Sequence, residues 1–428
     1  MAATLGERLL GEVAEEGLDE ILRDLRDWSD GTSVSFRNAS TGLKEIDKLL
    51  DVFAPMQHPT SAQTHGQATL PEDPVSCQEP QEGDQHGPTM PSTEHKPLTR
   101  GKNPVIEFSS LASGAGKSQL LGLLTAMAVL PSRWDQYQLD GRESAVVLID
   151  TDGRLDVERL RVIAQGIIRR QLPDQDSIES PEIDTIISTS LQHLHVFRPQ
   201  SSASLLATLQ QLDAYLLDLP RHFSSTRPLH AIVVDSASAF FWQDKLHDEV
   251  ARVEDIGRSY ADIEHDRHHK KSFYLSEMYA DLVAELKRLQ RRFDCAIIYT
   301  TASWSGRSAP PAGLGDPNPG PFTLYDPHLS MSRFPSCRPS LPAPWGTFPT
   351  VRFLVRREAV RPFPPAMTVA EAQGDAAMRH GVVLRGRFSA WVNGWGCEDW
   401  PRRVLDRLDQ MGWGMFTFNV RRDGVHVD

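Results

Sequence analysis

A glycine-rich loop between a short apolar segment and a longer one constrains the fold of this chain more than any other feature. The loop, residues 111–118, reads Leu-Ala-Ser-Gly-Ala-Gly-Lys-Ser. It follows the strand-like Val105–Phe108 and precedes an apolar segment, predicted as a helix, from Lys117 to about Leu130. A strand that turns directly into a helix presents backbone N–H groups at the positive end of that helix, where a phosphate group is stabilised. The segment therefore predicts a nucleotide-binding P-loop in an α/β protein.

The residue types of the loop match the chemistry of phosphate binding. Gly114 and Gly116 let the backbone curl around the β-phosphate. Lys117 reaches the β- and γ-phosphates, and Ser118 offers its hydroxyl to Mg²⁺. Leu111 stands where the usual motif has its first glycine, and it restricts the backbone at the loop entrance. A chance sequence in an ordinary turn is the alternative, and the flanking strand and helix argue against it. The residues that we predict to hold the nucleotide are Ala112, Ser113, Gly114, Ala115, Gly116, Lys117, Ser118 and Gln119.

Two aspartates follow predicted buried strands. Asp235 ends the aliphatic segment Ala231–Asp235, as the Walker B carboxylate does when it holds Mg²⁺ through water. An aspartate that caps a turn is the alternative. Asp152 comes just after the strand that ends at Asp150, where a carboxylate can orient or deprotonate an attacking water. We therefore predict Ser118 and Asp235 as the Mg²⁺ site and Asp152 as the catalytic residue.

The spacing of these segments separates two kinds of P-loop protein. Asp235 lies more than a hundred residues after the loop, which suits the RecA-like branch. Asp150–Gly153 also matches the Asp-x-x-Gly of GTPases, which need an Asn-Lys-x-Asp sequence to read guanine. No asparagine in the chain is followed by lysine. The sequence therefore argues against a GTPase.

Predicted strands and helices alternate through the middle of the chain. The strands are 105–108, 145–149, 193–197, 231–235 and 296–299, and the helices are 117–130, 157–171, 204–219 and 273–293. Strand-like segments follow at 350–355, 388–392 and 414–420. This order predicts an α/β fold with a mainly parallel central sheet and antiparallel C-terminal strands. We predict a polar loop for residues 243–271, which are rich in histidine and charged residues.

Composition divides the chain into five predicted parts. Residues 1–53 are a helical lead-in and residues 103–302 the ATPase core. Between them, residues 54–102 hold many Pro, Gln, His, Thr and Ser and almost no aliphatic residue, a composition that predicts a disordered insertion. Residues 303–347, rich in Pro, Gly and Ser, are predicted as a second, loop-like insertion that is also disordered. Residues 348–428 are predicted to complete the core with strands.

Charge and cysteine content exclude several classes of protein. The formal net charge of −12 argues against a protein that coats nucleic acid by bulk charge, although it allows a local basic face. The four cysteines form no Cys-x-x-Cys pair, which indicates a reducing compartment and no zinc site. The longest uncharged apolar run, Leu120–Pro131, is too short to cross a bilayer, so no membrane partner is predicted.

Four segments of the chain, in the same order, resemble the eukaryotic RecA-type recombinases of homologous recombination. Ser40–Leu50 resembles their lead-in to the core, and Gly116–Leu120 resembles the exit of their P-loop. Ile149–Leu160, with Ile-Asp-Thr-Asp-Gly at its start and Glu-Arg-Leu at its end, resembles their second core strand and its loop. Asp235–Asp244, which reads Asp-Ser-Ala-Ser-Ala-Phe-Phe-Trp-Gln-Asp, is the most specific and resembles the Walker B segment of one repair paralogue.

The resemblance implies a RecA-like P-loop NTPase core that binds ATP and Mg²⁺. It also implies a subunit of a hetero-oligomer of RecA-type recombinase paralogues, nuclear, acting on single-stranded or branched DNA in homologous recombination and double-strand break repair. The catalytic glutamate of the family falls on Asp152, one methylene shorter, and its γ-phosphate-sensing glutamine falls on Ala302, which cannot hydrogen-bond. Together with Leu111, these departures predict ATP binding with weak or no hydrolysis.

In filaments of this family two loops after the later core strands face single-stranded DNA, and they fall here on residues 243–271 and 303–346. Basic residues with an occasional aromatic suit backbone contact and base stacking. Residues of this kind in the two loops are Arg267, Lys270, Lys271, Trp304, Arg307, Arg333 and Arg338. Solvated loops without DNA contact are the alternative. Two other functions stay open: a P-loop ATPase or kinase unrelated to DNA, and a degenerate RecA-fold scaffold.

Overall fold

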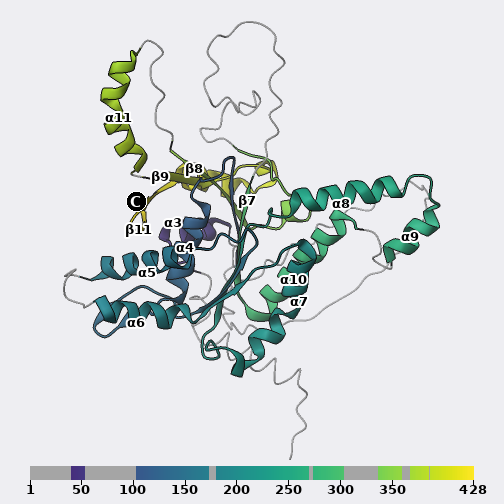
Figure 1. Ribbon diagram of the computed structural model, residues 1–428, viewed down its shortest axis with the longest axis horizontal. Coiled ribbons are helices and arrows are strands. Elements are labelled where there is room, and N and C mark those ends of the chain that lie inside the picture. Colours follow the sequence, from purple (N-terminus) through teal and green to yellow (C-terminus); the bar gives the residue numbers. More distant parts are fainter. Residues whose placement is uncertain are drawn as a thin grey trace, which may run out of the picture. The chain divides into compact units, whose positions relative to one another are not determined.

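A nine-stranded sheet carries the described part of the chain (Figure 1). The computed structural model describes residues 40–53, 103–172, 180–268, 273–302, 336–358, 367–384 and 386–428. All of them belong to one of the two units into which the chain divides. Residues 1–39 of the predicted lead-in, the predicted insertion 54–102 and residues 303–335 of the second predicted insertion lie outside the described residues.

The strand order of the sheet is β11-β10-β9-β8-β1-β7-β6-β4-β5. The strands are β1 Val105–Ser110, β4 Ala145–Asp150, β5 Leu194–Phe197, β6 Leu229–Asp235, β7 Ala296–Ala302, β8 Val351–Arg357, β9 Arg387–Val392, β10 Phe416–Arg421 and β11 Gly424–Val427, and a separate hairpin joins β2 Arg133–Trp134 to β3 Tyr137–Gln138. The strands from β8 to β5 in this order run parallel, whereas β9, β10 and β11 extend the sheet antiparallel. The α/β class with a mainly parallel centre and antiparallel C-terminal strands is confirmed.

Helices cover both faces of the parallel strands. The α-helices of the described residues are α3 Lys44–Phe53, α4 Lys117–Val129, α5 Val157–Gln171, α6 Ser180–Leu191, α7 Ser202–Leu217, α8 Phe241–Glu254, α9 Tyr260–His268, α10 Leu275–Phe293, α11 Val369–Leu384 and α12 Arg402–Gln410. Every residue of β1 and β4 is buried, as expected for strands that are covered on both sides. Within the described residues, none of these helices has the length and apolar character needed to span a bilayer.

Two separate apolar clusters fill the space on the two faces of the sheet. On β4, Val146 and Leu148 enter the cluster formed with α3, α4, α5 and α6. The alternate residues Val147 and Ile149 enter the cluster formed with α7 and α10. This alternation follows from the two-residue period of a strand. It explains why the predicted strands were near-continuous aliphatic runs.

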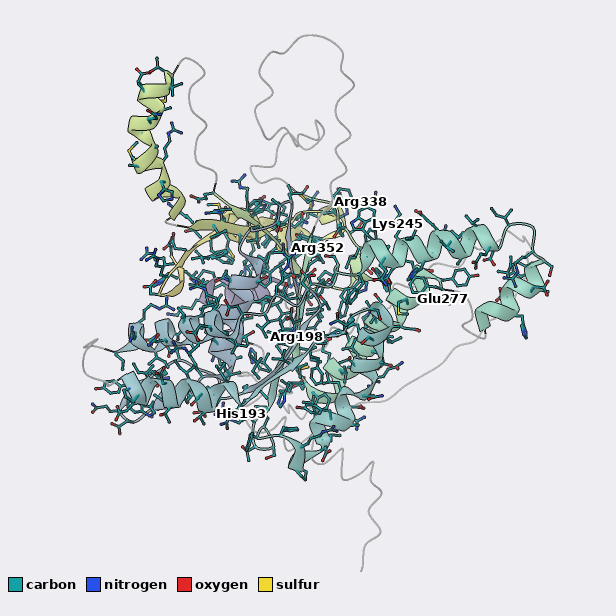
Figure 2. The ribbon with its side chains drawn as sticks, viewed as in Figure 1. His193, Arg198, Lys245, Glu277, Arg338 and Arg352 are labelled. Atoms are coloured by element: carbon teal, nitrogen blue, oxygen red, sulfur yellow. The ribbon has the colours of Figure 1, made fainter. Side chains whose placement is uncertain are left out.

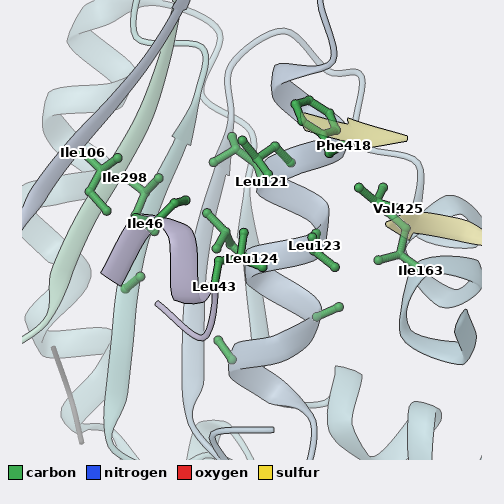
Figure 3. Packing of buried hydrophobic residues seen from close by; sticks show 14 of the residues in the cluster. Leu43, Ile46, Ile106, Leu121, Leu123, Leu124, Ile163, Ile298, Phe418 and Val425 are labelled. Carbon is green, nitrogen blue, oxygen red and sulfur yellow. The ribbon is translucent and has the colours of Figure 1, made fainter. Parts of the chain in front are cut away.

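The lead-in helix α3 belongs to the first of these clusters. Figure 3 shows Leu43 and Ile46 close to Leu124 of α4, with Ile106 and Ile298 of the sheet beside them. The turn before the helix is closed by Asp47, whose carboxylate accepts hydrogen bonds from the hydroxyls of Ser40 and Thr41 at 2.6 and 2.8 Å. The turn and helix predicted for residues 40–50 are confirmed.

The polar loop predicted for residues 243–271 is wrong, because most of it forms the helices α8 and α9. The charged residues that suggested a loop form helical pairs four residues apart, Lys245 with Glu249 and Asp248 with Arg252. Such pairs support an exposed helix. The large apolar residues between them, Leu246 and Val250, are exposed, so the usual core-facing pattern is missing. The sequence patterns also missed α6, α11, α12 and β11.

Residues 336–347, at the end of the second predicted insertion, pack against the core. Leu341 and Trp345 are buried in the cluster on the α7 and α10 face. The ring of Trp345 lies 5.0 Å from that of Tyr299 in β7, in an edge-on contact. The chain is therefore tied to the sheet before β8 begins.

Glu107 is a buried carboxylate in the centre of the sheet. It lies on β1 and accepts a hydrogen bond from Arg352 Nε of β8 at 2.6 Å. From β7 it accepts the hydroxyl of Thr301 at 2.7 Å and that of Tyr299 at 3.3 Å. Arg352 also donates to the carbonyl oxygen of Gly346 at 3.1 Å. The Glu107 carboxylate thus joins three adjacent strands, and its partner Arg352 adds the segment before β8.

We expect Arg352→Met to lower the free energy of unfolding by about 3–5 kcal/mol, because it leaves a buried carboxylate without its cation. Urea unfolding at pH 7 measures this value. The double variant Glu107→Gln/Arg352→Met should recover most of the loss, since no uncompensated charge stays buried. A loss below about 1 kcal/mol in the single variant, the range of an exposed pair, contradicts this assignment.

A cluster of histidines lies at β5, an edge strand of the sheet. His195 is buried, and its ring nitrogens lie 3.0 Å from the hydroxyl of Tyr215 and 2.9 Å from that of Ser224. His193 shares Ser224 at 3.1 Å. Burial, together with the neighbouring rings of His222 and His193, lowers the pKa of His195 to about 4. The folded protein therefore holds this imidazole neutral.

Because the folded pKa of His195 lies below its ordinary value, its contribution to stability is present above about pH 6.5 and is lost as the pH falls toward 4. Between pH 7 and pH 5, we expect this residue alone to lower the unfolding free energy by about 2 kcal/mol. His195→Gln keeps hydrogen-bonding groups but cannot titrate, so urea unfolding of this variant should lose correspondingly less over that range. His380→Gln, at an exposed position on α11, is the control and should behave as the unmodified protein does.

Candidate functional site

The glycine-rich loop joins the carboxyl end of β1 to the first turn of α4. Gly114 has φ 73° and Gly116 has φ 94°, a left-handed conformation that glycine adopts without strain. Gly116 is the residue before the helix, and the helix begins at Lys117. The loop therefore has the strand-to-helix position and the backbone curl that the sequence predicted for it.

An aromatic pair from the C-terminal strands lies against this loop. The rings of Phe388 in β9 and Phe418 in β10 stack with 5.2 Å between their centroids. A Cβ atom added to Gly116 would lie 2.8 Å from the Phe388 ring and 3.1 Å from the Phe418 ring. Phe418 lies beside α4 in Figure 3. Gly116 is thus required both by its backbone conformation and by the close approach of these rings.

The ammonium group of Lys117 is partly withdrawn from water. It donates a hydrogen bond to the hydroxyl of Ser110, at the end of β1, with 2.5 Å between the two atoms. Burial lowers its pKa, and the nearby carboxylates of Asp235 and Asp152 oppose this effect. A cation whose pKa falls despite two carboxylates nearby lacks full compensation of its charge. Lys117 is therefore a partly buried cation whose burial the two carboxylates do not fully offset.

The two residues predicted to hold Mg²⁺ lie at one small cavity. Ser118, exposed in the first turn of α4, and Asp235, at the carboxyl end of β6, both line a cavity of about 70 Å³. The Asp235 carboxylate also accepts a hydrogen bond from the Thr300 hydroxyl of β7 at 2.5 Å. The parallel pairing of β6 with β7 brings Thr300 to Asp235. A hydroxyl and a carboxylate are oxygen ligands of the kind that Mg²⁺ takes.

Asp152 lies in the turn after β4, with its side chain exposed on one side of the site. Partial burial raises the pKa of its carboxyl group, and the negative charges of Asp235 and Asp150 add to this effect. The group is therefore less readily ionised than an ordinary aspartate. Its position beside Asp235 and Lys117 agrees with the edge of the sheet at which the sequence expected it.

Asp150, in contrast, holds the turn that presents Asp152. It is buried, and its carboxylate accepts the backbone N–H groups of Arg154 and Leu155 at 3.0 and 3.1 Å. Arg198, marked in Figure 2, donates to it from the end of β5 at 3.1 Å. Asp150 is fully used by these contacts, so it has a structural task that the sequence reasoning did not assign.

Gln119, which the sequence placed among the nucleotide-binding residues, uses its side chain elsewhere. Its carbonyl oxygen accepts a hydrogen bond from Arg159 Nε of α5 at 2.7 Å. Arg159 also donates to the backbone carbonyl of Gly424 at 3.2 Å. The side chain therefore links α4 to the β10–β11 hairpin, which no sequence pattern indicated.

The other residues for which the sequence made predictions lie partly at the site, partly elsewhere, and partly outside the described residues. Leu111 is part of the loop and half-exposed. At Ala302, the backbone N–H donates to the Ser238 hydroxyl at 3.0 Å. Arg338 is exposed and lines a groove of about 580 Å³ together with Lys245, Arg252 and Trp395. Figure 2 marks Arg338 near Lys245. Lys270, Lys271, Trp304, Arg307 and Arg333 lie outside the described residues, as does the side chain of Arg267.

Gly116→Ala tests the fit between the loop and the aromatic pair. We expect it to lower the unfolding free energy by about 1–3 kcal/mol, because a Cβ atom must displace the Phe388 ring and adopt a left-handed conformation. Gly153→Ala is a matched control, since Gly153 also has positive φ (65°) but nothing within 4 Å of an added Cβ atom. Equal losses in both variants, measured by urea unfolding, would show that the rings do not constrain the loop.

Comparison with known proteins agrees with the resemblance to repair paralogues that the sequence motifs indicated. No family model matches the chain. It is 22% identical over 293 residues to a DNA repair protein XRCC2 homolog of Arabidopsis thaliana, a match that covers 63% of this chain and 73% of the plant protein. It is 30% identical over 142 residues to the DNA repair protein XRCC2 of Mus musculus, covering 33% of this chain and 42% of the mouse protein. The repair paralogue whose Walker B segment Asp235–Asp244 resembles is an XRCC2 protein. The chain is therefore similar to the XRCC2 DNA repair proteins.

Proposed function

We propose that this chain is an ATP-binding, RecA-like recombinase paralogue that acts in homologous recombination and in repair of DNA double-strand breaks. The similarity to XRCC2 proteins supports a role in recombinational DNA repair. The observation that supports ATP binding is the position of Lys117, a partly buried cation at the start of a helix and beside two carboxylates that do not fully offset its burial. A triphosphate with its metal ion would supply the charge that this arrangement lacks.

The residues of the site fit such a ligand. The backbone N–H groups of residues 112–119 would bind the phosphates, with Lys117 at the β- and γ-positions. Ser118 and Asp235 would hold Mg²⁺, which neutralises phosphate charge when it is bound. Thr300 keeps the Asp235 carboxylate oriented through its hydroxyl. Gly116 must stay without a side chain, because Phe388 and Phe418 occupy the space beside it.

We propose weak or absent hydrolysis. Asp152 is the residue available to orient a water molecule, but its raised pKa and short side chain make it a poor substitute for glutamate in a positioned site. Ala302, at the end of β7, offers no side-chain hydrogen bond to a γ-phosphate. The site is thus better suited to hold ATP than to consume it.

The proposal includes the assembly in which the chain would act. We infer that it is a subunit of a nuclear hetero-oligomer of RecA-type paralogues, and that single-stranded or branched DNA is the substrate of that assembly. An unrelated P-loop ATPase or kinase is the competing function, and no described observation favours it over the similarity to repair proteins.

Lys117→Ala is the direct test of ATP binding. With Mg²⁺, a fluorescent ATP analogue should bind the unmodified protein, and the variant should bind it at least about tenfold more weakly, a loss of about 1.4 kcal/mol. ATP should raise the melting temperature of the unmodified protein only. Lys48→Ala, at an exposed lysine of α3, is the control and should bind normally. Absence of binding by the unmodified protein would leave the scaffold function as the better account.

Hydrolysis is tested by restoring the family's residues. We expect the unmodified protein to release little phosphate, with or without single-stranded DNA, whereas Asp152→Glu/Ala302→Gln should raise turnover by about tenfold or more. Turnover by the unmodified protein that single-stranded DNA stimulates strongly would contradict the proposed loss of hydrolysis, while leaving ATP binding intact.

A further inference from the structure

Helix α8 turns its carboxylates inward. Asp244 and Asp248 are both buried. Asp244 accepts hydrogen bonds from the hydroxyl of Ser202 at 2.5 Å and from that of Tyr279 at 3.4 Å. Asp248 accepts the backbone N–H of Leu275 at 3.0 Å. The polar side of this helix is therefore the side that packs on its own protein.

The opposite side of α8 is apolar and exposed. Leu246, Val250 and Val253, with Ile256 just after the helix, are 59%, 47%, 65% and 77% exposed. With 100° of rotation per residue, the side chains of Leu246, Val250 and Val253 point away from Asp244 and Asp248. We call them the α8 stripe. The helix has the amphipathic pattern of a surface helix, but its apolar side is turned outward.

This arrangement differs from the scattered apolar residues of an ordinary surface. Single exposed apolar side chains are normal, whereas a continuous patch rimmed by polar groups marks a contact site. The spacing of the stripe, three or four residues, is that of a helix seam which packs against another helix. In Figure 1, α8 runs outward from the sheet and α9 follows at its far end.

A basic groove runs along one edge of the α8 stripe. Lys245 and Arg252 lie on this edge, and Arg338 lies across the groove from them. The carboxylates that line the same groove belong to Asp248 and Glu249. Asp248 pairs with Arg252 at 2.9 Å and Glu249 with Lys245 at 3.8 Å. Three cationic side chains thus face two carboxylates, which leaves one positive charge in excess.

We propose that the α8 stripe binds an amphipathic helix of a partner protein, with apolar side chains at three- and four-residue spacing and carboxylates on the edge that faces Arg338. An apolar seam takes an apolar partner, because only such a partner removes Leu246, Val250 and Val253 from water. A nucleic acid would satisfy the groove cations but leave the stripe in contact with water.

A second copy of the chain fits the surface less well. In an antiparallel contact between two helices, the same edge of each helix meets its equivalent. The groove edges of the two copies, each with one positive charge in excess, would then face each other, and like charges oppose association. An acidic edge on the occupant removes this repulsion and complements Arg338.

The test uses the full-length chain and a synthetic helix as the probe. The probe has about three heptads, leucine at the seam positions and glutamate along one edge; a matched probe has lysine in place of glutamate. We expect the glutamate probe to bind at least about tenfold more tightly than the lysine probe in fluorescence anisotropy. Leu246→Asp/Val253→Asp should weaken binding of the glutamate probe by about tenfold or more.

The controls separate docking from folding and from nucleotide binding. Val369→Asp, at a position of α11 that is 75% exposed, should bind the probe normally. The melting temperature of the double variant should equal that of the unmodified protein, because the replaced side chains are exposed. The assay contains no nucleotide, so a failure of ATP binding leaves its result unaffected.

Three results would overturn the proposal. Equal binding of both probes, or none, means that the surface does not select an acidic helix. Sedimentation that reveals a dimer of the unmodified chain but not of Leu246→Asp/Val253→Asp assigns the stripe to a second copy. Binding of an oligothymidine that is lost in the same double variant assigns the surface to nucleic acid.

Discussion

The contact between Glu107 and Arg352 is the interaction on which the sheet depends. It places a carboxylate and a guanidinium inside the protein, between β1 and β8, where either charge alone would cost several kcal/mol. The same carboxylate holds β7 through Thr301 and Tyr299. Since β1 leads directly into the glycine-rich loop, the strand that presents the loop is held on both sides. The C-terminal strands are attached to the sheet through β8, so they depend on this contact as well.

The C-terminal strands are part of the candidate site and not an appendage. Phe388 and Phe418 form the surface against which Gly116 lies, and Arg159 joins Gln119 of α4 to the carbonyl of Gly424. A chain without β9 and β10 would lose the aromatic support of its glycine-rich loop. At the same site, burial lowers the pKa of Lys117 despite two nearby carboxylates. Burial and neighbouring carboxylates raise the pKa of Asp152.

Most of the fold could be predicted where the pattern of the sequence followed burial. The strands around Val146 and Ile232 were recognisable because residues buried on both faces form continuous aliphatic runs. Helix α8 could not be recognised in this way, because Asp244 and Asp248 face the protein and Leu246 faces outward. The helix is amphipathic, but its polar side faces the protein and its apolar side faces outward. The polar partners of these aspartates, which make their burial possible, come from α7 and α10, and no local pattern contains them.

By itself, the sequence determined the local chemistry: a glycine-rich loop before a helix, Lys117 and Ser118 at its end, and carboxylates after two buried strands. These follow from residue types and spacing, because backbone freedom, charge and the ends of strands are local properties. Only the tertiary structure decided what surrounds them. It placed Phe388 and Phe418 against Gly116, engaged Gln119 with Arg159, and exposed the α8 stripe. These contacts join residues that are tens to hundreds of positions apart or depend on which side of a helix is covered, and packing of the whole chain determines both.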